Sequence, residues 1–410
     1  MKCERLRSVA SVCCHQATDP LLRSVDMWFG SIVRAKSLFC DRSADRLLVR
    51  SGKALLERIH HVTAVHVERS PRVLVTGATG FVGSRLLQTL IDRGYETYAV
   101  ARRPEKLVEI VARAPGDRFT ILAGDLLKDA DIEKLERDFA TRVKDLDFVI
   151  HLVGGGPLTS NNAFAKEITD LNYTATVNLL RILEKATKLS SISLFVYFSS
   201  LAAMGMPLSK DHRIVYSEAM ACNPVLPYER AKLQTETLLS QVAIQQDLKT
   251  LILRLPQIYG SATDPLVEIV DLMKKGAFPV VRNRVGSLPL VHVDDVVKAV
   301  CTAIENHERV GGPSEINLVG ERSCGYEDLA RMVRQKYGKG GLLEMPFWVL
   351  YAAIWAVELV FAASGRPEPL NRRRLLSMTK DRVIDCRRFV ATFGFEFDHD
   401  VESFLTNELV

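Results

Sequence analysis

The chain has 410 residues, of which 47% are hydrophobic and 25% are charged, as in ordinary globular proteins. That length predicts two or three domains, or one large domain with appendages. The formal net charge of +5 lies wholly within the first 70 residues, and the remainder of the chain is balanced. Because a neutral body offers no basic surface to DNA or RNA, we expect no nucleic-acid partner.

The first 70 residues carry no recognisable targeting signal. They lack the continuous apolar segment of a secretory signal, and they contain several acidic residues, which transit peptides avoid. We therefore expect residues 1–70 to form a poorly ordered N-terminal extension.

The eight cysteines suggest neither a metal cage nor a disulfide framework. Four lie in the first 40 residues, four are scattered later, and none forms a C-x-x-C pair. We therefore expect no bound metal. This cysteine usage favours a reducing compartment, so we expect a cytoplasmic protein.

From residue 71 onwards, short apolar runs alternate with helical patterns. The helical patterns include Phe81–Arg93, Ile132–Val143 and Asn172–Leu189. The runs that we expect to be strands are Arg72–Val75, Thr97–Ala101, Phe119–Leu122, Phe148–Val153, Leu194–Phe198 and Leu251–Leu255. This alternation predicts an α/β fold, a Rossmann-type doubly wound parallel sheet over residues 71–255. After residue 256 the pattern loosens, which predicts a smaller C-terminal substrate-binding lobe over residues 256–410.

The first predicted strand ends in a glycine-rich turn, TGATGFVG, which opens the first helix. Gly77 permits a tight turn, Gly80 lets the backbone approach a pyrophosphate, and Gly83 lets the helix pack closely on the strand. The free N–H groups and the positive end of the helix then face the phosphates. Strand, turn and helix in this order predict a dinucleotide site. Its expected contacts are Gly77, Thr79, Gly80, Phe81, Val82 and Gly83.

The residues after the later strands bear on the choice of cofactor. Arg102 and Arg103 stand where an NAD site would place an acid on the ribose. They can clamp a 2′-phosphate, which favours NADP over NAD, although solvated surface charges are the alternative. Asp125 and Leu126 are candidate contacts to the adenine, and Asp125 alternatively caps the next helix. Val153 and the glycines after it leave room for the middle of the cofactor.

Tyr228 and Lys232 are four residues apart and share one face of a predicted helix. Hydride transfer to a ketone needs a proton for the developing alkoxide, and the reverse reaction needs that proton removed. A phenol is a poor base at neutral pH, but a neighbouring ammonium lowers its pKa. Ser199 and Ser200 end the fifth strand, where a hydroxyl can bind a substrate oxygen. Together these residues predict a Ser–Tyr–Lys catalytic set.

These motifs resemble those of the extended short-chain dehydrogenase/reductases, the NAD-dependent epimerase/dehydratase family. The resemblance runs from about Pro71 to about Phe404. It implies that Ser200 is the catalytic hydroxyl. It also implies that Tyr228 is the general acid/base, and that Lys232 lowers the pKa of Tyr228 and holds the cofactor ribose.

Two further segments look like family motifs. Leu253–Gly260 is similar to the segment that contacts the nicotinamide, which adds Pro256 to the expected cofactor contacts. Leu290–Val296 is similar to a late V-D-D segment, in which Asp294 or Asp295 is expected to cap a helix.

The chain departs from the family's nucleotide-sugar epimerases at two positions. Leu288 stands where they commonly carry an arginine that grips the substrate pyrophosphate, and Gln257 stands where they often have asparagine. Both changes weaken a nucleotide-sugar interpretation, although Arg282 and Arg284 can substitute for the missing arginine.

Met345–Ser364 is an apolar stretch with one charge, Glu358. A helix of this length can cross a bilayer, but a charge within it opposes crossing. The alternatives are a buried or partly buried helix of the lobe and a helix that lies on a membrane, with Trp348, Tyr351 and Trp355 near the interface. Enzymes resembling 3β-hydroxysteroid dehydrogenases often have apolar segments here. With Arg372–Arg374 close behind, we expect peripheral attachment to membranes.

Taken together, the residues predict an NAD(P)-dependent oxidoreductase that interconverts a secondary alcohol and a ketone on an apolar, sterol- or lipid-like small molecule. One alternative is a nucleotide-sugar epimerase or dehydratase with the same catalytic set. Another is a non-catalytic dinucleotide-binding assembly subunit, against which the Tyr228–Lys232 pair argues. A homodimer is one assembly that the sequence leaves open.

Overall fold

The computed structural model describes residues 69–113, 118–207, 211–261 and 264–409. The expected N-terminal extension over residues 1–70 lies outside the described residues, except for its last two positions.

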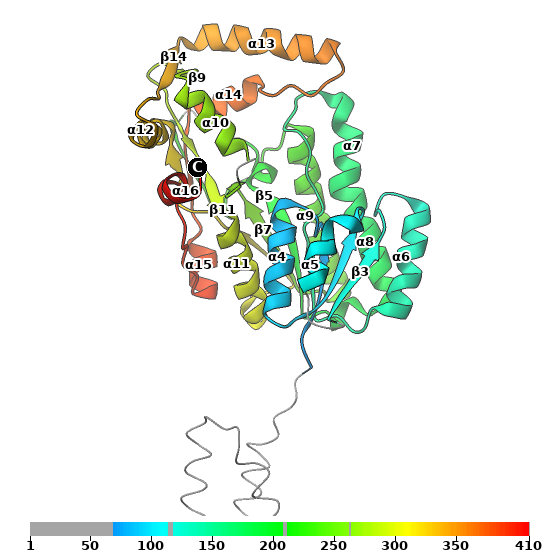
Figure 1. Cartoon of the computed structure of the whole chain (residues 1–410). Helices are drawn as coiled ribbons and strands as arrows, with labels where there is room; N and C mark the ends of the chain where they lie inside the picture. The colour runs from blue at the N-terminus through cyan, green and yellow to red at the C-terminus, as the bar shows by residue number, and fades with distance from the viewer. Residues whose placement is uncertain (1–68, 114–117, 208–210, 262–263, 410) are drawn as a thin grey trace, which may run out of the picture. The chain divides into compact units, whose positions relative to one another are not determined.

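A seven-stranded parallel sheet forms the centre of the described chain (Figure 1). Its strand order is β12-β7-β5-β4-β1-β2-β3. The strands are β1 (Arg72–Thr76), β2 (Glu96–Ala101), β3 (Phe119–Ala123), β4 (Phe148–His151), β5 (Leu194–Ser200), β7 (Thr250–Leu255) and β12 (Ser314–Leu318). The five inner strands are almost wholly buried on both faces, as parallel strands require, whereas the edge strands β3 and β12 are partly exposed. The predicted doubly wound α/β fold is therefore confirmed.

Helices cover both faces of this sheet. One apolar core lies under α4 (Phe81–Asp92), α11 (Val293–Glu305) and α15 (Arg387–Phe393). The other core lies under α6 (Asp129–Arg142), α8 (Ala175–Ala186) and α9 (Pro227–Gln246). The remaining segments of this half are α5 (Val108–Arg113), α7 (Ala165–Thr169) and the π-helical turn η3 (Asp170–Thr174).

The order of the strands reverses between β1 and β4. The chain runs outward from β1 through β2 to β3, and then returns to β4 and runs the other way. Ligands of such sheets bind in the crevice outside the carboxyl ends of the strands at this switch point. The outermost strand, β12, comes from the segment after residue 256 and pairs in parallel with β7. Residues from both sides of position 256 therefore build the sheet.

A third apolar core lies in the part of the chain after residue 256. It lies between α10 (Pro265–Lys274), α12 (Tyr326–Tyr337) and α16 (Val401–Asn407). Pairs of short strands surround it: β8 (Gln257–Tyr259) with β11 (Leu290–His292), β9 (Phe278–Val281) with β14 (Leu342–Met345), β10 (Ser287–Leu288) with β13 (Cys324–Gly325), and β6 (Arg213–Tyr216) with β15 (Asp381–Ile384). Short paired strands of this kind form an irregular lobe beside the sheet.

The apolar stretch near the end of the chain forms helix α13 (Phe347–Ala363), which is followed by α14 (Arg372–Met378). Figure 1 shows α13 at the outer edge of the lobe. Leu350 and Ile354 of this helix are buried and most of its other side chains are exposed, so it is a partly buried helix of the lobe, which is one of the alternatives that the sequence left open. None of the helices in the described ranges is long and apolar enough to cross a membrane.

Candidate active site

The glycine-rich turn joins β1 to α4 at the switch point. Gly77 has a φ of +74°, and its carbonyl accepts a hydrogen bond from the Gly80 N–H at 3.0 Å. A Cβ placed on Gly83 would lie 2.2 Å from the Gly77 oxygen, so only glycine allows this close packing of helix on turn. Gly80 begins the helix without a side-chain cap. The turn therefore presents backbone rather than side chains to a ligand.

A pocket of about 270 Å³ lies beside this turn. Its walls come from the turn, the carboxyl ends of β4, β5 and β7, and the first turns of α9. The lining residues are Gly77, Gly80, Phe81, Val82, Gly83, Leu152, Gly154, Phe198, Ser199, Ser200, Tyr228, Lys232, Leu255, Pro256 and Ile258. The structure thus brings the expected catalytic residues together with Pro256 and five of the six expected turn residues; Thr79 is absent from the lining.

The other expected cofactor contacts lie outside this pocket, at the ends of the neighbouring strands. Arg102 and Asp125 follow β2 and β3, and their side chains approach to 3.9 Å. Asp125 accepts a hydrogen bond from the Leu127 N–H, whereas Lys128 occupies the N-cap position of α6, so the expectation that Asp125 caps this helix is wrong. Arg103 is exposed. These positions are within reach of the far end of a long dinucleotide rather than its reactive end.

Two of the expected contacts belong largely to the core. Leu126 is buried under α6 and α8, and its carbonyl accepts a hydrogen bond from Asn178. Val153 is half-buried and packs against the same core. Any contact of Leu126 with a cofactor must therefore use its backbone.

Asn172 holds the loop after β4 in place, and sequence reasoning missed it. This fully buried side chain donates to the Gly155 oxygen at 2.7 Å and accepts from the Gly155 N–H at 3.0 Å. Gly154, Gly155 and Gly156 all have positive φ values, which L side chains rarely adopt. Asn172 lies in the π-helical turn η3, a feature frequent at functional sites. The sequence feature that could have pointed to Asn172 is a polar asparagine on an otherwise apolar face of the predicted helix.

Tyr228 and Ser200 line the same pocket. Tyr228 stands at the start of α9 and Ser200 at the end of β5, where the Ser200 hydroxyl accepts a hydrogen bond from the Ala202 N–H at 3.1 Å. Burial raises the pKa of the Tyr228 phenol, while the nearby Ser200 hydroxyl acts in the opposite direction. The phenol is therefore held protonated at neutral pH. The expected lowering of this pKa by Lys232 is not found, and burial sets the direction of the shift.

Lys232 is buried one helical turn beyond Tyr228. Its Nζ donates to the Phe198 oxygen at 2.8 Å and to the Tyr197 hydroxyl at 3.2 Å. Nζ lies 6.0 Å from the centre of the Tyr228 ring. Burial lowers the pKa of Lys232 to about 7, despite the charge of Glu236. This amine can therefore change its charge near neutral pH at a point beside the pocket.

The structure distinguishes the two serines that end β5. The Ser199 hydroxyl donates to Glu236 at 2.5 Å, and Glu236 forms a buried ion pair with Arg254 at 2.6 Å. Ser199 is thus engaged in a charged network inside the protein. Ser200 lies outside this network and lines the pocket together with Tyr228.

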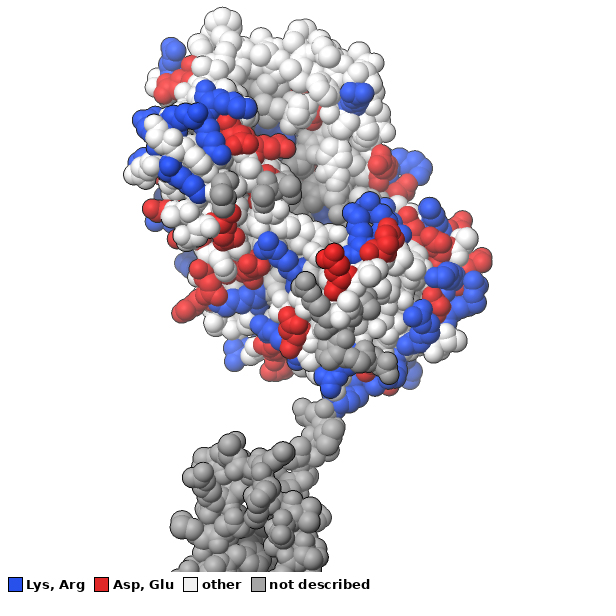
Figure 2. All heavy atoms as spheres, in the orientation of Figure 1, with Lys and Arg blue, Asp and Glu red and all other residues white. Residues whose placement is uncertain are grey.

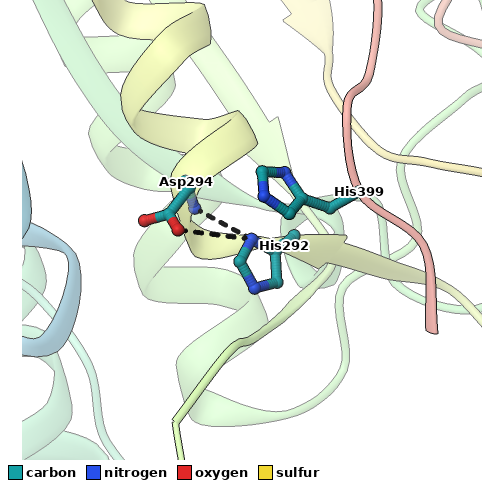
Figure 3. A group of neighbouring side chains, drawn as sticks. All are labelled: His292, Asp294 and His399. Atoms are coloured by element: carbon teal, nitrogen blue, oxygen red, sulfur yellow. Dashed lines mark hydrogen bonds and ion pairs between the residues drawn. The ribbon is translucent and has the colours of Figure 1, made fainter. Parts of the chain in front are cut away.

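A second group of polar side chains lies in the lobe, where His292, Asp294 and His399 meet (Figure 3). The two imidazoles stack with their centres 4.1 Å apart and their planes 18° from parallel. Metal ligation needs nitrogen lone pairs, which lie in the ring planes, to converge on one point. Nearly parallel rings cannot do this, so the cluster is unsuited to an ion as it stands.

This cluster instead closes one end of α11. The His292 side chain caps the helix by accepting from the Asp294 N–H at 3.3 Å, so the expectation that Asp294 or Asp295 caps it is wrong. Buried Asp295 accepts hydrogen bonds from the backbones of Asp398 and His399. It fastens the segment that leads to α16.

Comparison with known proteins places these features in a family. The model of the "NAD dependent epimerase/dehydratase family" matches residues 73–319, which include the glycine-rich turn, Ser200, Tyr228 and Lys232.

Two curated relatives show how widely the similarity extends. A putative UDP-glucose 4-epimerase of Methanocaldococcus jannaschii is 23% identical over 66% of this chain and 83% of its own length. A sterol-4-alpha-carboxylate 3-dehydrogenase (decarboxylating) of Dictyostelium discoideum is 26% identical over 76% of this chain and 92% of its own length.

Among solved structures, the UDP-glucose 4-epimerase of Thermotoga maritima with UDP-glucose is similar, with a TM-score of 0.60 and 20% identity. The match covers 82% of this chain and 97% of that one. It supports the fold described above.

Proposed function

Because this chain belongs to the NAD-dependent epimerase/dehydratase family, we propose that it is an NAD(P)-dependent oxidoreductase that interconverts a secondary alcohol and a ketone on an apolar, sterol- or lipid-like substrate. One observation carries the proposal: Ser200, Tyr228 and Lys232 line the same pocket as the glycine-rich turn. Proton transfer and hydride transfer would therefore take place side by side.

The turn fits a dinucleotide phosphate group. Its glycines leave the backbone bare, and a Cβ on Gly83 or Gly77 would meet backbone atoms at 2.2 and 3.0 Å. On the other side of the pocket, a Cβ on Gly155 would meet no atom within 4 Å, which leaves open space there. When bound, the nicotinamide supplies or accepts the hydride.

The protein's own residues account for the proton. Tyr228, kept protonated by burial, donates its phenolic proton to the developing alkoxide during reduction and becomes a phenolate. In the reverse direction it is this phenolate that takes the proton from the alcohol as the alcohol is oxidised. Ser200 orients the substrate oxygen through its hydroxyl. Lys232 holds the cofactor ribose, and its ammonium form stabilises a developing phenolate.

The lining of the pocket favours an apolar substrate. Phe198, Leu255 and Ile258 stand beside the catalytic groups. Leu288, at the position of the missing arginine, is buried in the core of the lobe. The sterol dehydrogenase relative supports the same substrate class.

A nucleotide-sugar epimerase with the same catalytic set is the second candidate. Its support is the number of UDP-glucose 4-epimerases among the relatives and similar structures. Arg282 and Arg284 are exposed at the end of β9, where they offer charge for a diphosphate. The non-catalytic assembly subunit has no such support, since the catalytic side chains are intact.

The proposal includes a preference for NADP. Arg102 and Arg103 stand at the end of β2 in place of an acid, and Arg102 already lies near Asp125 at the same edge of the sheet. A 2′-phosphate there would gain charged hydrogen bonds. It also includes peripheral attachment to membranes through residues 345–364.

A substrate screen tests the proposal. Purified protein would be mixed with NADP or NAD and with panels of sterols, flavonoids and UDP-sugars, and cofactor absorbance would be followed. We expect absorbance changes with hydroxysteroids or ketosteroids and none with UDP-sugars. The Tyr228→Phe variant is the control and should change the absorbance with neither class of compound. Activity on UDP-sugars alone would establish the epimerase instead. Cofactor binding without turnover on any panel would favour the assembly subunit.

A further inference from the structure

Helix α13 presents an apolar surface to solvent. Trp348, Trp355 and Leu359 form an outward ridge at helical spacing, and they are 72%, 49% and 51% exposed. Tyr351 and Val360 flank the ridge and are also exposed. Elsewhere, exposed large apolar side chains are scattered singly, which is normal for protein surfaces. A helix on a protein surface ordinarily turns polar residues outward, and this one does not.

The only charged residue of α13, Glu358, lies on the side of the helix that faces the protein. Leu350 and Ile354 pack on Val281 and Leu375. On the same side, Glu358 forms an ion pair with Arg372 at 2.7 Å, and its side chain is 13% exposed. Glu358, the charge that opposes crossing of a bilayer in the sequence, is therefore turned toward the protein and neutralised. The outward face remains free of charge.

Basic residues stand at both ends of this face. Arg282 and Arg284 are exposed in the turn after β9, and the Arg282 N–H bonds to the Met345 oxygen just before α13 begins. Arg366 is exposed just after the helix ends. Figure 2 shows a white cap at this end of the molecule with blue side chains at its margins.

The three arginines after the helix, Arg372–Arg374, contribute less positive charge to this surface than the sequence suggests, because each is engaged within the protein. Arg372 is paired with Glu358, and Arg373 donates to the Asn223 oxygen. The Arg374 guanidinium donates to the Pro369 oxygen. These contacts leave Arg282, Arg284 and Arg366 as the cationic rim of the surface.

We propose that α13 lies flat on an anionic phospholipid bilayer, with Trp348, Trp355 and Leu359 among the acyl chains and the arginine rim at the phosphates. Indole and phenol rings favour the boundary between headgroups and acyl chains, and arginine favours phosphate. A helix of 17 residues, roughly 25 Å long, gives a line of contact rather than a single anchor. A second copy of the chain is a poorer partner, because a symmetric contact would bring the two arginine rims together.

The same segment is tied to the pocket. Between α13 and α14, Glu368 accepts a hydrogen bond from the Ser160 hydroxyl at 2.8 Å, and Asn371 donates to the Leu158 oxygen at 2.7 Å. Residues 158–160 belong to the loop that begins at Gly154 beside the pocket. In α14, the Arg373 guanidinium approaches Glu229, the neighbour of Tyr228, to 3.5 Å.

These contacts connect the segment that follows α13 to the loop and to the helix that border the pocket. We therefore extend the proposal to the source of the substrate, which is drawn from the membrane rather than from water. This extension rests on the proposed function, whereas the docking of α13 does not.

Docking is tested with the full chain and vesicles of phosphatidylcholine containing phosphatidylserine. We expect co-sedimentation at low salt and partial release at high salt. Trp348→Ser/Trp355→Ser/Leu359→Ser should lower the partition coefficient more than tenfold. Ile244→Ser, which removes an equally exposed side chain on α9, should leave it unchanged. Cofactor binding by each variant confirms its fold. Equal binding by the triple variant and the wild type would overturn the proposal.

Charge-reversing substitutions test whether the arginine rim contacts the anionic headgroups. Arg282→Glu/Arg366→Glu should reduce binding to phosphatidylserine vesicles about tenfold or more, whereas Lys188→Glu, exposed on the sheet half, should have no such effect. Unchanged binding by the double variant would show that the rim does not meet the headgroups.

The same vesicles also test how deeply the tryptophans enter the bilayer and whether α13 binds a second copy of the chain instead. In a Trp28→Phe background, Trp348 and Trp355 should shift to shorter emission wavelengths on vesicles and be quenched more by shallow than by deep nitroxide lipids. Stronger quenching by deep labels would mean insertion across the bilayer and would overturn the proposal. So would a wild-type dimer that becomes monomeric in the triple variant while neither binds vesicles.

The source of the substrate is tested separately, with an alcohol identified in the screen. The triple variant should show a raised KM for vesicle-borne substrate and an unchanged KM for the same substrate in detergent. Equal KM values in vesicles would overturn the extension. Vesicle binding without any turnover would defeat the proposed function and leave docking intact.

Discussion

The sheet half and the lobe treat their buried polar groups differently. In the sheet half, fully buried His151 lies between the hydroxyls of Thr76 and Thr176, at 2.6 and 2.9 Å. Burial and the charge of Lys232 lower its pKa to about 3, so it remains neutral. Glu236 is likewise matched by Arg254 and Ser199. Every one of these groups is satisfied, which makes this half a rigid support for the cofactor turn.

In the lobe, the opposite holds. Among the described residues, seven of the nine buried side-chain atoms without a hydrogen-bond partner come after residue 256, and one of these seven, on Asn317, lies in β12 of the sheet. Another is one oxygen of Glu321, whose other oxygen accepts a hydrogen bond from the Tyr259 hydroxyl at 3.1 Å. Helix α13 adds apolar side chains that face outward. We infer from this contrast that the sheet is the more stable part of the described chain, and that the lobe keeps features that favour contact with other molecules. The following predictions test this contrast, from the largest expected effect to the smallest.

The largest effect is expected at the catalytic centre in the sheet half. Tyr228→Phe should lower turnover by about two to four orders of magnitude, because the positioned proton donor is lost. Cofactor affinity, measured by calorimetry, should be unchanged. Tyr337→Phe, in α12 of the lobe, is the matched control and should keep full activity. A fully active Tyr228→Phe enzyme would show that another group transfers the proton.

The buried carboxyl of the lobe should show itself in the pH dependence of stability. Burial raises the pKa of Glu321 from 4.5 to about 8. Between these values the unfolded state ionises and the folded state stays protonated, so stability falls as pH rises, by at most about 1.4 kcal/mol per pH unit. Glu321→Gln removes this loss, and its advantage in Tm over the wild type should grow from about pH 5 to about pH 8.

Exposed Glu327 supplies the control for this measurement. Glu327→Gln should follow the wild type at every pH. If the Tm difference between Glu321→Gln and the wild type is constant with pH, Glu321 ionises normally in the folded state, and the contrast between lobe and sheet loses one of its supports.

The glycine turn should tolerate no side chain at the helix contact. Gly83→Ala places a Cβ 2.2 Å from the Gly77 oxygen, which should destabilise the fold by roughly 2 kcal/mol and weaken cofactor binding. Gly312→Ala, where no atom lies within 4 Å, should change neither. Denaturant unfolding and calorimetry measure the two effects, and a Gly83→Ala protein with normal values would mean that the turn can relax.

The smallest effect concerns the choice of cofactor. Arg102→Ala should lower the affinity for NADPH about tenfold and leave that for NADH unchanged, since a hydrogen bond between charged groups contributes roughly 1.5 kcal/mol. Arg181→Ala, an exposed arginine on α8, is the control. Equal affinity of the wild type for both cofactors would remove the basis for the NADP preference.

The fold of the sheet half could be predicted because its signals are local. The six predicted strands all occur within a few residues of their observed bounds, since buried parallel strands are continuous apolar runs between glycine or polar turns. Strand β12 was missed: its sequence SEINL alternates in character, as an edge strand does, and its partner β7 is distant along the chain. Long-range pairing of this kind leaves no mark on local periodicity.

The candidate site was predictable to the extent that its chemistry depends on spacing. Tyr228 and Lys232 on one helix, and the three glycines of the turn, are such cases. The direction of the Tyr228 pKa shift was not predictable, because it depends on burial by residues from other segments. Asn172 was missed for the same reason, since its partner Gly155 belongs to a loop with no periodicity. The side of α13 that faces solvent also could not be predicted from the sequence, because both sides of this helix are apolar.

Strand β12 affects how the chain can be made. Until residues 314–318 have left the ribosome, β7 is the border of a nearly complete sheet, with its outer backbone groups unpaired. Such a border can recruit strands from neighbouring chains. Polypeptides that end between residues 255 and 314 should therefore aggregate. Those that end after residue 318 contain β12, which pairs with β7 and covers this edge of the sheet. Fusing a reporter of solubility to successive end points would locate this transition along the chain.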